Sequence, residues 1–195
     1  SPNYRSLTGK VKIKLLKNMT PKTAPNLNIK SIIKSDKLIK IDIENNNDFL
    51  EFSIDNGKTW QDSPEFKDLT PDTTYKIIYR FKETEFQCAS EVGSIQEIST
   101  KGYYSLKPGK PKVKRRTRHE IILENPNNLL EFSIDNGKTW QSTGVFSNLK
   151  GNKNYEFISR FKENEQYMPS LPSNSAKIST RNWLTSLIVN HLLGK

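Results

Sequence analysis

The sequence predicts an all-β chain of two tandem β-sandwich modules, with an extra N-terminal strand and a short C-terminal helix. Three observations predict this class. The twelve residues LEFSIDNGKTWQ occur without change at 50–61 and at 130–141. Segments that alternate apolar and polar residues are separated by turn residues about every eight to twelve positions, the spacing of a sandwich. Inside the two copies, no segment has the apolar period of a helix.

The identity of the two stretches extends into a longer internal repeat. Phe66 aligns with Phe146, Tyr75 aligns with Tyr155, and the triplet IST occurs at 98–100 and again at 178–180. Self-similarity at a fixed period indicates one structural unit present twice. The predicted division is an N-terminal strand segment at 1–23, module 1 at 24–101, a basic linker at 102–110, module 2 at 111–180 and a C-terminal helix at 181–195.

Four segments of the first copy are predicted as strands. Residues 37–44 (KLIKIDIE) alternate isoleucines with charged residues, as a half-buried strand does. The others are β-branched, aromatic or alternating, and they lie at 49–54, 74–82 and 94–100. A further segment, 9–16 (GKVKIKLL), has the pattern of a strand that belongs to a preceding module. We expect it to pair within this chain, although an open edge could also add to the sheet of a neighbouring chain.

The Asp-Asn-Gly triplet at 55–57 lies between two strand patterns and predicts a hairpin. A two-residue loop would place Trp60 opposite Ser53 on the outer face. A three-residue loop would place Trp60 opposite Phe52, in the core. Because burying a tryptophan stabilises by about 2–3 kcal/mol, the three-residue loop is favoured. Asp55 is then expected to cap the turn, and Gly57 to supply a positive φ.

Residues 53–60 (SIDNGKTW) and their copy at 133–140 resemble the Asp-box, S-x-D-x-G-x-T-W, of sialidase propellers. In that family the box is a structural hairpin away from the active site. The resemblance implies a structural role for six residues: Asp55, Gly57, Trp60, Asp135, Gly137 and Trp140. The alternative is that exposed Trp60 and Trp140 stack on sugar rings.

Residues 69–75 (LTPDTTY) resemble the L-x-P-x-T-x-Y segment of fibronectin type III domains. In those domains the tyrosine hydroxyl bonds back to the chain at the corner before the next strand. The second copy keeps only Leu149 and Tyr155, which predicts a weaker corner there. The whole repeat resembles the fibronectin-type-III-like modules of Gram-positive bacterial surface proteins. This resemblance implies two immunoglobulin/fibronectin-III-like sandwiches that act as a non-catalytic spacer or binding module.

The formal net charge of +10 favours an acidic partner, unless it only reflects a Lys- and Asn-rich codon usage. The most basic stretch surrounds the start of module 2. A strand at 112–118 would send alternate cations to one face and could follow the phosphates of a polyanion such as nucleic acid or cell-wall polymer. The alternative is an edge strand that charge protects from aggregation. The candidate polyanion-binding residues are Lys112, Lys114, Arg115, Arg116 and Arg118.

The C-terminal stretch 182–193 (NWLTSLIVNHLL) is predicted as a helix that is apolar over most of its circumference. It is too short to span a bilayer and too apolar to stand alone in water. We expect it to pack on module 2, on a partner subunit or on a membrane surface. The candidate partner-binding residues are Trp183, Leu184, Leu187, Ile188 and Leu192.

No catalytic, nucleotide-binding or metal-binding motif is recognisable, so the chain is predicted to be no enzyme and to need no cofactor or metal. Residues 45–48 (NNND) fit a polar loop better than a calcium site. Cys88 is the single cysteine, which excludes an internal disulfide.

The predicted function is that of a structural or interaction protein of a bacterial cell envelope or extracellular assembly. It would bind protein partners or self-associate, and it would be extracellular or at the cell surface, with a cytoplasmic location left open. One alternative is a nucleic-acid- or polyanion-binding protein. The other is a carbohydrate-binding module.

Overall fold

The computed structural model describes residues 23–44 and 48–182. Three predictions fall wholly or mostly outside these residues: the strand at 9–16, the loop at 45–48 and the C-terminal helix at 181–195. They remain predictions. The candidate partner-binding residues that lie in this undescribed part are Trp183, Leu184, Leu187, Ile188 and Leu192.

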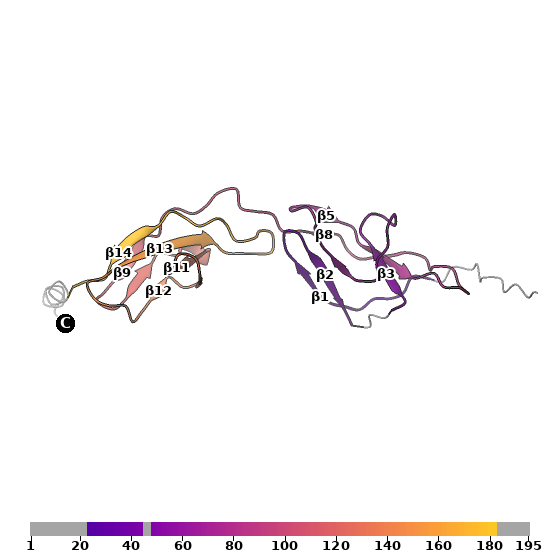
Figure 1. The fold of residues 1–195 in the computed structure, drawn as a ribbon, viewed down its shortest axis with the longest axis horizontal. Helices are drawn as coiled ribbons and strands as arrows, with labels where there is room; N and C mark the ends of the chain where they lie inside the picture. The colour runs from indigo at the N-terminus through magenta and orange to yellow at the C-terminus, as the bar shows by residue number, and fades with distance from the viewer. Residues whose placement is uncertain (1–22, 45–47, 183–195) are drawn as a thin grey trace, which may run out of the picture. The chain divides into compact units, whose positions relative to one another are not determined.

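The first copy is built from eight strands that form three small sheets (Figure 1). One sheet has the order β1-β2-β4, the second β3-β6-β7, and β5 pairs with β8 in a third. The strands are β1 (Ile29–Lys34), β2 (Ile39–Ile43), β3 (Leu50–Ser53), β4 (Glu65–Phe66), β5 (Thr74–Tyr75), β6 (Ile78–Phe81), β7 (Gly93–Ser94) and β8 (Ile98–Ser99).

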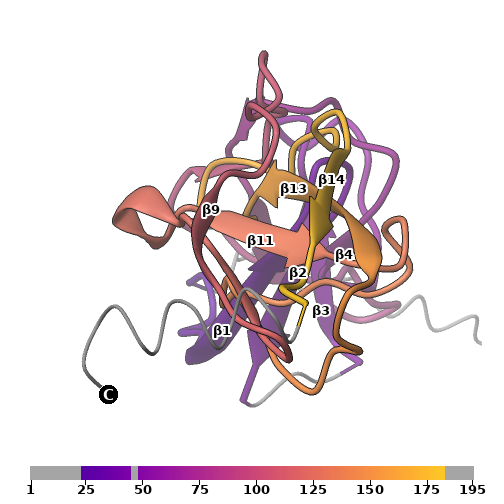
Figure 2. The ribbon, with the colours of Figure 1, turned by 90° about the vertical axis from the view of Figure 1, so that its left-hand side faces the viewer.

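The second copy repeats this arrangement with six strands in two sheets, seen end-on in Figure 2. The sheet orders are β12-β10-β9 and β11-β13-β14, which match β4-β2-β1 and β3-β6-β7 of the first copy. The elements are β9 (Val113–Arg116), β10 (Ile121–Leu123), the 3-10 turn η1 (Pro126–Asn128), β11 (Leu130–Ser133), β12 (Val145–Phe146), β13 (Asn154–Phe161) and β14 (Ala176–Ser179).

Corresponding strands pair in the same register in both copies. In the antiparallel pair β3–β6, Leu50 faces Phe81 and Ser53 faces Ile78. In the pair β11–β13, Leu130 faces Phe161. The predicted strand at 74–82 is interrupted in the first copy, where β5 ends and β6 begins, whereas its counterpart β13 is continuous. The backbone bond from Ile95 N–H to the Ile77 carbonyl, 2.8 Å, bridges this interruption.

Alternation along the strands sorts the side chains as predicted. On β2, Ile39, Ile41 and Ile43 are buried, while Lys40 and Asp42 between them are exposed. The second copy has one buried cluster that draws on both of its sheets: Ile121, Leu123, Phe132, Phe146, Phe157 and Ile178. Since each sheet supplies half a core, the two sheets must pack face to face, and the fold of each copy is all-β as predicted.

The described residues divide into two compact units whose boundary does not follow the repeat. Residues 34–39 and 67–74 of the first copy group with the residues from Ser99 onward, and the rest of the first copy forms the other unit. The module bounds 24–101 and 111–180 therefore stay a prediction. Across the described part of the chain, the helical residues amount to the single turn η1, and none of them could make a membrane-spanning helix.

Candidate functional site

The repeated stretch folds into a turn that one serine and one aspartate close. In the first copy the Ser53 hydroxyl donates to Asp55 Oδ1 at 2.8 Å and accepts the Gly57 N–H at 2.9 Å. Asp55 Oδ1 also accepts the Thr59 N–H at 2.9 Å, and Asp55 Oδ2 accepts the Thr59 hydroxyl at 2.6 Å. Gly57 has φ +84°, which a residue without Cβ adopts at least cost.

The second copy builds the same turn from the same residue types. Ser133 donates to Asp135 Oδ1 at 2.7 Å and accepts the Gly137 N–H at 2.8 Å. Asp135 accepts both the Thr139 N–H, at 2.9 Å, and the Thr139 hydroxyl, at 2.6 Å. The Trp140 indole N–H donates to the Gly137 carbonyl at 3.1 Å. In each copy, both oxygens of the carboxylate are thus engaged inside the turn.

These hydrogen bonds depress the pKa of both carboxylates. The bonds from the hydroxyl and the backbone N–H of Thr59, followed by the bond from Ser53, lower the pKa of Asp55 from 3.8 to about 2. The bonds from Thr139 and Ser133 lower the pKa of Asp135 further. Each donor stabilises the charged form of the acceptor. Both carboxylates are therefore ionised at neutral pH.

The tryptophans do not enter the core, so the three-residue loop predicted from burial is wrong. Phe52 N–H donates to the Gln61 carbonyl at 2.7 Å and Gln61 N–H returns a bond to Phe52 at 2.9 Å, which places Gln61 opposite Phe52. Trp60 is displaced to the outer face and is half-buried. The reason is that Ser53 and Asp55 close a wider loop, whose parity the Asp-Asn-Gly triplet alone does not set.

Each tryptophan lies against an arginine that is itself held by a glutamate. The Arg80 guanidinium carbon lies 3.9 Å from the ring centroid of Trp60, and Arg80 Nε donates to Glu51 Oε1 at 2.6 Å. Glu51 and Arg80 are cross-strand partners on β3 and β6. In the second copy, Arg160 lies 4.2 Å from the Trp140 centroid. A cation over the ring contributes about 0.5–1 kcal/mol at an exposed site, and it covers one face that a sugar would need.

The corner before β13 carries the tyrosine bond that the family resemblance implies. The Tyr155 hydroxyl accepts the Lys150 N–H at 2.8 Å. This bond forms although Gly151 and Lys153 stand where the first copy has proline and threonine. Loss of those two residues from the motif does not abolish the corner.

A buried threonine fastens this corner in both copies, and sequence reasoning missed it. The Thr180 side chain is 3% exposed; its hydroxyl donates to the Lys150 carbonyl at 2.8 Å and accepts the Lys153 N–H at 3.1 Å. Thr100 is equally buried and accepts the Thr73 N–H at 3.0 Å. The triplet IST, identical in both copies, was the available signal.

The candidate polyanion-binding residues lie on and beside β9, an edge strand of its sheet. All five side chains are exposed: Lys112, Lys114, Arg115, Arg116 and Arg118. Two of them have partners within the chain. Arg115 pairs with Glu120 at 2.6 Å, and Arg116 Nη1 donates to the Ser179 carbonyl at 3.2 Å.

The cations of β9 do not form one regular row. Ile122 faces Arg115 and Leu123 faces Val113, so Lys114 is the extra residue of a bulge. A bulge re-aims side chains and interrupts the alternation of the strand. The expected single-faced row through Lys112, Lys114 and Arg116 is therefore broken at Lys114, a device that also protects edge strands.

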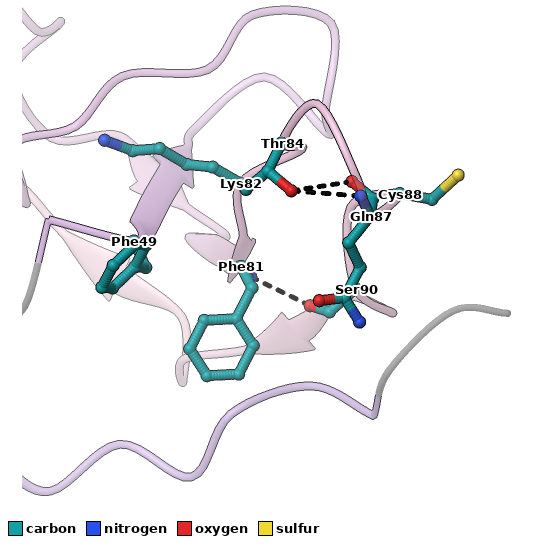
Figure 3. Close-up of a pocket in the computed structure, with 7 residues that line it drawn as sticks. All are labelled: Phe49, Phe81, Lys82, Thr84, Gln87, Cys88 and Ser90. Atoms are coloured by element: carbon teal, nitrogen blue, oxygen red, sulfur yellow. Dashed lines mark hydrogen bonds between the residues drawn. The ribbon is translucent and has the colours of Figure 1, made fainter. Parts of the chain in front are cut away.

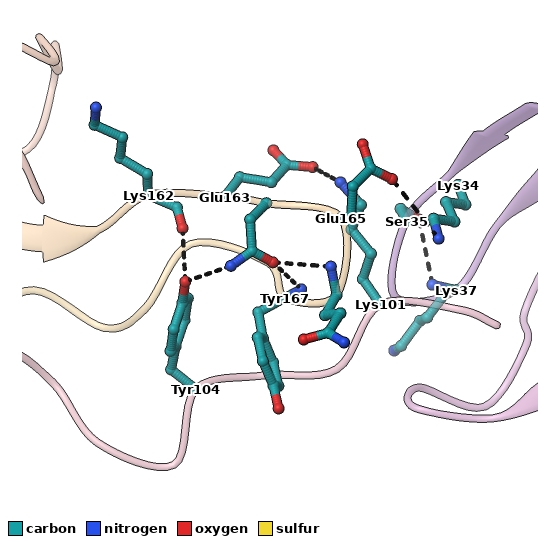
Figure 4. A network of polar contacts seen from close by, with 11 residues as sticks. Lys34, Ser35, Lys37, Lys101, Tyr104, Lys162, Glu163, Glu165 and Tyr167 are labelled. Carbon is teal, nitrogen blue, oxygen red and sulfur yellow. Dashed lines mark hydrogen bonds and ion pairs between the residues drawn. The ribbon is translucent and has the colours of Figure 1, made fainter. Parts of the chain in front are cut away.

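A linker segment crosses the loop that joins β13 to β14 (Figure 4). The Tyr104 ring lies 5.1 Å from Phe161 and 4.9 Å from Tyr167, measured between centroids. Its hydroxyl donates to the Lys162 carbonyl at 3.1 Å and accepts the Asn164 side-chain N–H at 2.9 Å. Tyr104 is thus bound on both its apolar and its polar side.

The same loop in the first copy borders an open groove of about 320 Å³ (Figure 3). Its walls are held by two short bonds: Ser90 accepts the Phe81 N–H at 2.9 Å, and Thr84 accepts the Gln87 N–H at 3.1 Å. The lining residues are Phe49, Phe81, Lys82, Thr84, Gln87, Cys88 and Ser90.

Metal and acid–base chemistry find few candidate groups in the described ranges. No cluster of three or more His, Cys, Asp or Glu side chains that could hold a metal occurs within 23–44 and 48–182. His119 Nδ1 bonds to the Leu149 carbonyl at 2.8 Å.

Comparison with known proteins finds similar solved structures but no sequence family. No family model matches the chain, and no curated protein matches it significantly. The FN1–FN3 domains of chicken CNTN1 share 17% identity over 83% of this chain and 67% of theirs, with a TM-score of 0.43. A two-domain fibronectin type III segment of chicken tenascin shares 16% over 82% and 100%, with a TM-score of 0.29. The central fibronectin-III array of RIM-binding protein shares 14% over 83% and 69%, with a TM-score of 0.31.

Proposed function

We propose that this chain is a non-catalytic structural and interaction protein, with two tandem fibronectin-type-III-like modules that serve as a spacer and bind a protein partner. Its setting would be a bacterial cell envelope of the Gram-positive type or a similar extracellular assembly. One observation carries the proposal. The residues that both copies retain unchanged direct their polar groups into their own turn, not toward a ligand.

The arrangement of Asp55 and Trp60 supports this reading. A carboxylate that serves a substrate needs an oxygen directed outward, but both oxygens of Asp55 accept bonds from Thr59. A tryptophan that stacks on sugars needs an open face, but Arg80 lies over Trp60. The repeated motif is therefore best explained by hairpin stability, and the contacts with a partner would lie elsewhere. We place self-association or partner binding at the C-terminal segment from Trp183 to Leu192.

A second candidate function is supported by the edge strand β9. Five cationic side chains are exposed on and beside it, and the formal net charge of the chain is +10. Such a surface would hold an anionic wall polymer or nucleic acid through phosphate contacts, with affinity that falls steeply with salt. The two candidates predict different responses to salt and to protease, which allows them to be separated.

The test is retention of the labelled full-length chain on isolated Gram-positive cell envelopes. Three envelope preparations are compared: untreated, protease-treated, and stripped of teichoic acid, each over a range of salt concentrations. A protein partner predicts binding that survives high salt and is lost after protease treatment. Binding that is lost with salt and with the anionic polymer, but survives protease, would overturn the first proposal in favour of the second.

Light-scattering mass tests the C-terminal segment in the same chain. Leu187→Asp is compared with Lys195→Asp as a control at the end of the chain. A concentration-dependent mass that falls to the monomer only in Leu187→Asp supports assembly through this segment. Equal masses for both variants and the parent chain would remove it from the proposal.

A further inference from the structure

The two copies carry equivalent grooves beside the loop that follows β6 or β13, and the linker fills one of them. Within 49–100 and 129–180, equivalent residues differ by 80 positions, so Phe81 corresponds to Phe161 and Gln87 to Tyr167. Tyr104 covers Phe161 and Tyr167 in the second copy. The groove of the first copy shows what such a site looks like when no described residue lies in it.

In the second copy the linker binds as a short added strand. Gly102 N–H donates to the Gln166 carbonyl at 2.8 Å, and Met168 N–H donates to the Gly102 carbonyl at 2.9 Å. These two bonds form a parallel bridge between Gly102 and Tyr167. Backbone bonds of this kind require an extended segment but no particular side chain. The side chain of Tyr104 then closes the apolar part of the groove.

The first copy offers the same elements to a binding segment. Its groove, about 320 Å³, could hold about ten waters at roughly 30 Å³ each. The Phe49 side chain at its rim is 64% exposed, although it is large and apolar. Gln87 takes part in a β-bridge, as Tyr167 does at the equivalent position. Exposed apolar surface of this kind next to a bridging backbone indicates a docked strand.

The position of that strand in the sequence follows from the repeat. The turn bonds Ser35 N–H to the Leu38 carbonyl and Thr117 N–H to the Glu120 carbonyl are equivalent and differ by 82 positions. Counting back from the first strand by the same offset, the linker residues 101–104 correspond to 19–22, with the sequence MTPK. These residues immediately precede Thr23, where the described chain begins.

We infer that residues 19–22 bind in the groove of the first copy as a short parallel strand beside Gln87, in the way that the linker binds beside Tyr167. Thr20 takes the place of Gly102 in the bridge. The apolar parts of Met19 and Pro21 cover Phe49 and Phe81. Each copy would thus bind the segment of chain that precedes it, and the groove is an intrachain docking site for a linker.

Paramagnetic broadening in the full-length chain tests this placement. Cys88 is the single cysteine, and its sulfur points away from the groove (Figure 3), so Cys88→Ser provides a background for labelling. A nitroxide on Thr20→Cys is expected to reduce the amide cross-peaks of residues 84–88. The matched control is a nitroxide on Tyr103→Cys, which must reduce those of 164–168 in the occupied groove. Comparable losses at both grooves support the proposal.

Two further outcomes would overturn it. The Thr20 label could leave 84–88 unchanged while the Tyr103 label broadens 164–168, which would show that residues 19–22 are not in the groove. Alternatively, broadening at 84–88 could appear only when labelled chain is mixed with isotope-labelled chain that has no nitroxide. That result would assign the groove to the segment of a second copy.

A second variant checks that the contact has a structural effect. Replacing both Met19 and Pro21 by glycine in the full-length chain removes the apolar cover and keeps the backbone. We expect cross-peak shifts confined to residues 49, 81–90 and their neighbours, together with a lower midpoint of unfolding for the first copy. Tyr104→Ala is the matched change in the second copy and should shift 161–168. No shift at 81–90 would contradict docking.

Discussion

Replacing Thr180 by valine removes one buried hydroxyl and keeps the shape of the side chain. The hydroxyl makes two strong contacts: it donates to the Lys150 carbonyl at 2.8 Å and accepts the Lys153 N–H at 3.1 Å. Valine can replace neither bond. Because the site is 3% exposed, water cannot easily take the place of the hydroxyl.

The expected loss follows from counting the two bonds. Each hydrogen bond contributes about 1 kcal/mol net, so Thr180→Val should destabilise the second copy by about 2 kcal/mol. For a domain of 60–100 residues, 1 kcal/mol shifts the melting temperature by about 4–8 °C, which gives a decrease of about 8–16 °C. Thr180→Ser keeps the hydroxyl and loses one methyl group, so it should cost only about 1 kcal/mol.

The assay is a urea titration followed by amide cross-peaks, which reports each copy separately. Thr180→Val should lower the midpoint for residues of the second copy and leave that of the first copy unchanged, since distant sites act independently. Thr100→Val is the mirror experiment and should affect only the first copy. If valine and serine at position 180 gave equal midpoints, the hydroxyl would contribute nothing, and the assigned role of Thr180 would be wrong.

Three further predictions concern the repeated hairpin. The pKa of Asp55 is lowered from 3.8 to about 2, so its contribution to stability is complete above pH 3.8 and is lost as the pH falls toward 2; an NMR titration of the carboxylate that gave an unshifted pKa would contradict this. Gly137→Ala should destabilise by about 1 kcal/mol, because Gly137 has φ +85°; a melting temperature equal to that of the parent chain would refute the strain. Arg160→Met and Glu131→Gln should each destabilise, and a double-mutant cycle should give a coupling of about 0.5–1 kcal/mol, discounted because the pair is partly exposed. Additive effects of the two changes would show that the pair is not coupled.

The strands and their buried faces could be predicted because local alternation decides them. Ile39, Ile41 and Ile43 lie on one face of any extended chain, and a sheet needs one apolar face. The positive φ of Gly57 and the bonds to Asp55 also follow from residue type, since the turn is closed within a few residues of sequence. Predictions of this kind need no knowledge of distant partners.

The orientation of Trp60 could not be obtained in the same way. Burial favoured the core register, but the bonds that Ser53 makes to Asp55 and Gly57 widen the loop and reverse the parity. Arg80, which covers the displaced ring, lies on another strand. The energy of burying one tryptophan was weighed correctly only once its alternative partner was known.

The sequence by itself determined that this chain is all-β, repeats one module and keeps a structural turn in each copy, because these properties depend on alternation, turn chemistry and identity between copies. Only the tertiary structure decided that Thr180 fastens a corner and that Tyr104 fills a groove. Thr180 bonds to residues about 30 positions earlier, and Tyr104 contacts residues about 60 positions later. Contacts over such separations depend on how the sheets pack, which no local pattern records.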